Sequence, residues 1–151
     1  MSPDTDTPPD LHLVVGYDGS APAGRALDAA VRLRHGRTGR ITVVYVAHMP
    51  SLDMLSPGAL VEMEASFDEI ERELRTSAGE QLGDGEAWDF ERRQGLIAEE
   101  LIAVSNDIRA AHPDDTVVIV VGSSSHAVHR LVGSVAVSLA RHSPVPLVVA
   151  P

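Results

Sequence analysis

The sequence predicts an α/β fold, a doubly wound parallel sheet of five strands with two helices on each face. Short runs rich in valine alternate along the chain with longer stretches whose apolar residues recur at helical spacing. The run Val117 to Val121 is unbroken, as expected of a strand that is buried on both faces. With 2 Phe, 2 Tyr and 1 Trp the core must be aliphatic, which suits helices layered on such a sheet. The length of 151 residues corresponds to one domain.

Residues 1–10, MSPDTDTPPD, form a polar and proline-rich tail. Such a segment cannot pack, so we expect disorder there and one folded domain over residues 11–151. The tail lacks an apolar signal core, and no stretch approaches the roughly 20 apolar residues that span a bilayer. We therefore expect a soluble, cytoplasmic protein with no membrane partner.

The first predicted strand, Leu11–Tyr17, ends at the turn sequence Asp18-Gly19-Ser20. Ser20 is a suitable N-cap for a helix that continues to about residue 35. A second valine-rich strand follows over Ile41–Ala47. The intervening helix must return the chain parallel to the first strand, so this segment predicts a β-α-β unit.

The rest of the chain continues the alternation of helices and strands. We expect a helix over 58–82, a strand over Ala87–Arg92, a helix from Ile97 to about His112, a strand over Thr116–Val121, a helix over Arg130–Arg141 and a last strand over Leu147–Val149. The inner stripe of the helix over 58–82 is predicted to hold Val61, Phe67, Ile70, Leu74 and Ala78.

Charge and composition exclude several classes of function. The formal net charge of −10 would repel a phosphate backbone, so no nucleic-acid partner is expected. All twelve cationic residues are arginine, which rules out a P-loop lysine and a Schiff-base lysine. Without cysteine there is no disulfide, no thiol nucleophile and no thiolate metal site.

The segment VVIVVGSSSHAVHRLVGSVAV, residues 117–137, is the strongest functional candidate. A buried strand ends at Gly122, small polar residues follow, and Gly133-Ser134 precedes the next apolar stretch. Glycine permits close approach of a ligand, and free amides at a helix start attract anions. The alternative is a plain turn, which is the more common role of a Gly-Ser loop after a strand. In doubly wound sheets ligands bind beyond the carboxyl ends of the strands, here between Asp18 and Gly122.

Together with VVGYDGS, VVYV and PVPLVVAP, this segment resembles the universal stress protein family over residues 11–151. The resemblance implies strand order 3-2-1-4-5, a homodimer, and in one branch ATP binding through Gly-x2-Gly-x9-Gly-Ser/Thr. Gly122 and Gly133-Ser134 match the ends of that motif. Ser125 occupies the position of the middle glycine. Seven residues separate Ser125 from Gly133, where the family motif has nine.

The resemblance also implies which residues meet the nucleotide. Asp18 matches the residue that meets the adenosine, and Val46 matches the one whose backbone meets the base. The phosphate-loop positions are Gly122, Ser125, Gly133, Ser134 and Val135. The cofactor would be ATP or AMP, with no metal beyond magnesium carried by the nucleotide. Asp18 has an alternative role as a turn residue, because Asp-Gly favours turns in any protein.

Other titratable residues give weaker predictions. His126 and His129 are three apart, so on a helix both imidazoles would share a face and could hold a metal, but no third ligand is evident. They are otherwise expected to face solvent, or His126 and Arg130 to lie near bound phosphates. Glu99 and Glu100 are adjacent on a helix and face different directions, so they form no acid/base pair.

Two functions therefore remain open from the sequence: a nucleotide-binding stress regulator, and a dimeric interaction module that binds no nucleotide. A third, an enzyme, is not expected, because no nucleophile or metal set emerges, with weak ATP hydrolysis left open. The homodimer is expected at the last strand, Leu147–Val149, since an apolar edge strand tends to be covered by a partner.

Overall fold

Five parallel strands form one sheet in the computed structural model, which describes residues 7–51, 53, 55–123 and 133–151. The strands are β1 (Leu11–Gly16), β2 (Gly39–Ala47), β3 (Trp88–Gln94), β4 (Thr116–Gly122) and β5 (Leu147–Ala150). Their order is β3-β2-β1-β4-β5, and each neighbouring pair is parallel. The predicted fold class and strand order are confirmed.

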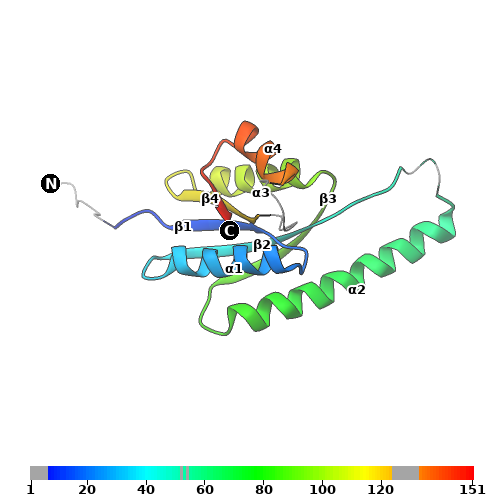
Figure 1. The fold of residues 1–151 in the computed structure, drawn as a ribbon, viewed down its shortest axis with the longest axis horizontal. Helices are drawn as coiled ribbons and strands as arrows, with labels where there is room; N and C mark the ends of the chain where they lie inside the picture. Colours follow the sequence, from blue (N-terminus) through cyan, green and yellow to red (C-terminus); the bar gives the residue numbers. More distant parts are fainter. Residues whose placement is uncertain (1–6, 52, 54, 124–132) are drawn as a thin grey trace.

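Four helices cover the two faces of the sheet. They are α1 (Ala21–Arg34), α2 (Pro57–Leu82), α3 (Ile97–Ala111) and α4 (Ser134–His142). Figure 1 shows α1 and α2 on one side of the sheet and α3 and α4 on the other. Helix α1 begins as predicted, with Ser20 as the N-cap whose Oγ accepts a hydrogen bond from the amide of Ala23 at 3.3 Å.

The core consists of two layers separated by the sheet. Leu13 and Val15 of β1 pack in the layer under α1 and α2, whereas Val14 packs in the layer under α3 and α4. All three side chains are completely buried. This is why Leu13, Val14 and Val15 are all apolar, since successive side chains of a strand point to opposite faces and both faces of β1 are covered.

The inner stripe of α2 is only partly as predicted. Phe67, Leu74 and Ala78 are buried, but Val61 is 71% exposed and Ile70 is 37% exposed. The prediction for these two residues was wrong because the amino-terminal half of α2 extends beyond the sheet, as Figure 1 shows. The apolar residues of α2 do follow a helical period, but among the described residues no other layer covers Val61 or Ile70.

The last helix was predicted over Arg130–Arg141; residues 130–132 lie outside the described residues, and the prediction was wrong for Gly133. Gly133 has φ −59° and ψ 160°, which is an extended conformation, and α4 begins at Ser134. The first helical hydrogen bond runs from the amide of Val137 to the carbonyl of Gly133 at 3.1 Å. The other elements begin and end within one or two residues of their predicted bounds.

Of the predicted tail, only residues 7–10 are described, and they form no helix or strand. Asp10 is nevertheless held in place, since its carbonyl accepts a hydrogen bond from the amide of Thr116 at 2.9 Å. Within the described parts of the chain, no helix is long and apolar enough to cross a membrane.

Candidate functional site

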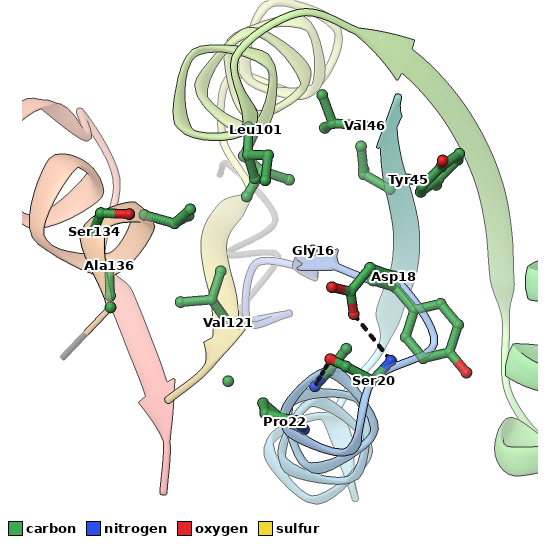
Figure 2. A pocket seen from close by; sticks show the side chains of 17 residues that line it. Gly16, Asp18, Ser20, Pro22, Tyr45, Val46, Leu101, Val121, Ser134 and Ala136 are labelled. Carbon is green, nitrogen blue, oxygen red and sulfur yellow. Dashed lines mark hydrogen bonds between the residues drawn. The ribbon is translucent and has the colours of Figure 1, made fainter. Parts of the chain in front are cut away.

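A pocket of about 310 Å³ opens at the carboxyl ends of β1, β2 and β4. Helix α1 leaves β1 toward one face of the sheet, and the chain after β4 leads to α4 on the other face, so the winding reverses here. Figure 2 shows the pocket enclosed by the start of α1, the ends of β1 and β2, helix α3 and the start of α4. A crevice at this switch point is where doubly wound sheets bind ligands.

The pocket brings together six of the seven residues predicted for the nucleotide site. They come from four separate parts of the chain and are Asp18, Val46, Gly122, Gly133, Ser134 and Val135. The seventh, Ser125, lies outside the described residues, as do His126, His129 and Arg130. The structure therefore places these six around one cavity, whose volume is in the range of small-molecule sites.

Asp18 has a structural role that the sequence also predicted. Its Oδ1 accepts a hydrogen bond from the amide of Ser20 at 3.0 Å, which closes the turn between β1 and α1. Gly19 occupies the left-handed region of this turn, with φ +78°. Asp18 is exposed and lines the pocket, and Figure 2 shows its second carboxylate oxygen directed toward the cavity. One side chain thus serves the turn and presents an acceptor to a ligand.

Gly122 is required by protein packing, independently of any ligand. A Cβ at this position would lie 2.1 Å from the carbonyl oxygen and 2.4 Å from the carbonyl carbon of Pro22, in the first turn of α1. The sequence interpretation attributed this glycine to close approach of a ligand. The structure shows that close approach of α1 to β4 already excludes a side chain.

The start of α4 provides hydrogen-bond donors to the pocket. Ser134, Val135 and Ala136 are the first three residues of the helix and all line the cavity. The amides of a first helical turn have no partner within the helix, and the N-cap, Gly133, has no side chain that could accept from them. They therefore form an anion-attracting end, strengthened by the helix dipole.

The apolar walls of the pocket were not identified from the sequence. Leu101 of α3 and Val44 of β2 are fully buried, and Ile97, the first residue of α3, is 45% exposed. In the sequence Leu101 and Ile97 belong to a helical stripe and Val44 to a strand, so nothing distinguished them from core residues. Their contribution to a cavity depends on how α3 is placed over β1 and β2.

The lining of the pocket is mostly apolar, with few polar groups. Among the lining residues that the structure describes, Asp18 is the one carboxylate, and there is no imidazole to pair with it. The cavity combines apolar walls with one acidic acceptor near α1 and a set of amide donors at α4. It therefore fits a ligand with a flat or apolar body, hydroxyl donors and an anionic end.

Comparisons with known proteins agree with this architecture. The family model described as the universal stress protein family matches residues 11–151. No curated protein matches the sequence of the chain. Among solved structures, hypothetical protein MJ0577 is 16% identical with a TM-score of 0.73, over 92% of this chain and 94% of that one.

Two further solved structures carry adenine nucleotides. A universal stress protein in complex with cAMP is 22% identical with a TM-score of 0.63, over 93% of this chain and 97% of that one. A universal stress protein family protein from Arabidopsis thaliana with AMP bound is 14% identical with a TM-score of 0.55, over 92% and 90%. At these identities the likeness extends to the fold.

Proposed function

Because the chain belongs to the universal stress protein family, we propose that it is a regulatory domain that binds an adenine nucleotide, ATP or AMP, in the pocket between β1 and β4. The observation that carries this proposal is the chemical polarity of the pocket, with Asp18 at one end and the amides of α4 at the other. Fold neighbours in complex with cAMP and with AMP give independent support.

The adenosine part would lie near Asp18 and Val46. A carboxylate is an acceptor for ribose hydroxyls, and Asp18 presents one oxygen to the cavity while the other holds the turn. Val46 is partly exposed at the end of β2, so its backbone and the apolar side chain of Leu101 opposite would contact the base. Burial of the flat base against such walls supplies the apolar part of the affinity.

The phosphates would rest on the amides of Ser134 and Val135 at the start of α4. Both residues line the pocket, and the positive end of the helix dipole favours an anion there. Without any lysine in the chain, charge neutralisation would come from arginine or from magnesium carried by the nucleotide. Gly122 enters this proposal as a packing residue that lets β4 end close to α1.

A second candidate function is that of a dimeric interaction module without nucleotide, and β5 favours it. This strand pairs with β4 alone, so it is an edge of the sheet, and it is apolar and partly exposed. The carbonyls of Pro146 and Ala150 accept hydrogen bonds from the β4 side. Since alternate residues of a parallel strand bond to the same neighbour, the amides of Leu147 and Val149 face outward, available to a second copy.

Calorimetry of the purified chain with ATP and with AMP tests the first function directly. Gly133→Val should lower the affinity well over tenfold, equivalent to about 1.4 kcal/mol or more, because it places a branched side chain where the phosphates would rest. Valine tolerates the extended backbone of this residue, so the fold should survive. Gly58→Val is the matched control, since Gly58 also stands at a helix start but in open space outside the pocket.

No heat of binding for either nucleotide at millimolar concentration would reject this function and leave the interaction module. Equal loss of affinity in Gly133→Val and Gly58→Val would reject the assignment of the phosphate position.

Asp18→Asn separates the two roles of that side chain. The asparagine oxygen still accepts from the amide of Ser20, so the free energy of unfolding should change by less than about 0.5 kcal/mol. The carboxylate that meets the ribose is lost, so nucleotide affinity should fall severalfold, by roughly 1 kcal/mol. Unchanged affinity in a stably folded variant would restrict Asp18 to the turn.

A further inference from the structure

Two histidines and an aspartate meet at the amino-terminal edge of the sheet, the end opposite the nucleotide pocket. His12 is the second residue of β1, Asp115 directly precedes β4, and His112 is the C-cap of α3. One nitrogen of each imidazole and one oxygen of Asp115 all lie within 4.8 Å of one another. None of the three residues lines the pocket, so this cluster is separate from the proposed nucleotide site.

The cluster is held in place by the fold. In the pairing of β1 with β4, His12 lies opposite Val117, which is two residues after Asp115. His12 Nε2 is 2.9 Å from Asp115 Oδ2. The Oδ1 of Asp115 accepts a hydrogen bond from the amide of Asp10 at 3.2 Å, which leaves Oδ2 facing the two imidazoles. His12 is only 8% exposed, and its ring stacks on that of His112 with centroids 4.9 Å apart.

We propose that His12 Nε2, His112 Nδ1 and Asp115 Oδ2 bind a divalent transition-metal ion of the zinc class. Two imidazoles and a carboxylate are a ligand set that suits zinc, with a water completing a tetrahedral site. Magnesium and calcium prefer oxygen ligands, so they should compete poorly here.

The two distances from Asp115 are close to those of a tetrahedral site. Ligand atoms about 2.1 Å from a tetrahedral ion lie about 3.4 Å from one another. Asp115 Oδ2 is 2.9 Å from His12 Nε2 and 3.7 Å from His112 Nδ1, so both separations are within several tenths of an ångström of that value. The two imidazole nitrogens are within 4.8 Å of each other and their rings are stacked, so the half-exposed His112 ring would turn toward the ion on binding.

The protonation states also permit binding. The hydrogen bond from His12 holds the pKa of Asp115 below its ordinary value, so the carboxylate is ionised at neutral pH. In the metal-free protein a proton lies between His12 Nε2 and Asp115 Oδ2. On binding, this proton moves to Nδ1 when the ring is neutral, or leaves to solvent when both ring nitrogens carry a proton, so that a neutral imidazole binds the ion through Nε2.

The bound ion would join β1 to the turn between α3 and β4. His12 of β1 and Asp115, which directly precedes β4, meet here although they are about a hundred positions apart in the chain. An ion that binds the folded chain and not the unfolded one stabilises the fold in proportion to the logarithm of its concentration. The site would thus act on the stability of the central strands and not on the pocket lining.

The experiment is a zinc titration of the full, metal-free chain by calorimetry, with cobalt absorption as a second measurement of coordination. Wild type should bind one ion. His112→Ala and Asp115→Asn should each lower the affinity at least tenfold, or about 1.4 kcal/mol. His112 is half-exposed, so its removal should leave the fold intact, which circular dichroism checks.

The control is a variant in which His126 and His129 are both alanine. These residues are the other closely spaced histidines of the chain, and their loss should leave zinc affinity within about twofold. Zinc should also raise the melting temperature of wild type and of this control, but not of His112→Ala. Absence of zinc binding by wild type, binding that survives both ligand variants, or binding lost only in the control would overturn the proposal.

Discussion

The substitution Gly122→Ala tests whether this glycine serves the packing of α1 or the approach of a ligand. A Cβ at residue 122 would meet the carbonyl oxygen, the carbonyl carbon and Cβ of Pro22 at 2.1, 2.4 and 2.8 Å. Two of the three atoms belong to the backbone, which cannot rotate away. Either the first turn of α1 or the end of β4 must therefore move by roughly 1 Å.

Neither segment can move without loss of other interactions. The first turn of α1 is fixed by the Ser20 N-cap and by Ala23, which is buried in the core. The end of β4 is held as well, because Gly122 pairs with Ala150 of β5. Overpacking at a site of this kind costs about 1–3 kcal/mol, and contact with backbone atoms favours the upper end. The ordinary gain of less than about 1 kcal/mol for Gly→Ala offsets part of that.

We therefore expect Gly122→Ala to lower the free energy of unfolding by about 2 kcal/mol in the complete absence of nucleotide. At about 2–4 °C per kcal/mol for a chain of this size, the melting temperature should fall by about 4–8 °C. Urea unfolding followed by circular dichroism measures the first quantity, and thermal unfolding the second.

Gly58→Ala is the matched control for this substitution. Gly58 lies in the first turn of α2, and a Cβ there would meet nothing within 4 Å. Alanine should be neutral or stabilise the chain by up to about 1 kcal/mol. If Gly122→Ala unfolds within about 0.5 kcal/mol of wild type, the packing explanation is refuted and the ligand explanation of this glycine regains its place.

Two further predictions concern the pocket wall and the sheet edge. Leu101→Ala should lower the free energy of unfolding by about 2–3 kcal/mol, which is the lower part of the usual range for a buried leucine. The reason is that the Leu101 side chain is fully buried but borders an open pocket. A loss below about 1 kcal/mol in urea unfolding would contradict this. Val149→Pro should convert the expected homodimer to a monomer in light scattering, with little loss of monomer stability. The reason is that the amide of Val149 faces away from β4 and makes no hydrogen bond to it. A dimer that persists would show that β5 is not paired with β5 of the second copy.

Much of the fold could be predicted from the sequence because its signals are local. Valine runs too short for helices, and helical stripes between them, define the order of strands and helices without knowledge of any distant contact. The Ser20 N-cap is a signal of the same kind, since the hydroxyl bonds an amide three residues away. The strand order came from the resemblance, which the sheet topology confirms.

The site could be predicted only in part. The rule for doubly wound sheets predicted a crevice between Asp18 and Gly122. The resemblance to the family assigned Val46 and the Gly133 to Val135 segment to it, and all of these residues line the pocket. Leu101 could not be assigned to the pocket, because a wall residue and a core residue have the same sequence pattern. Val61 and Ile70 follow the helical period, but the period does not say where the covering layer ends.

By itself, therefore, the sequence determined which segments are strands and helices and where the chain turns, because backbone preference and side-chain period act over a few residues. Tertiary structure alone decided why residue 122 is glycine, since the obstacle is Pro22, a hundred residues earlier. It also decided that His12 meets His112 and Asp115, because that contact exists only once β1 and β4 pair in one register. Register and layer spacing follow from packing of the whole chain, and no local pattern encodes them.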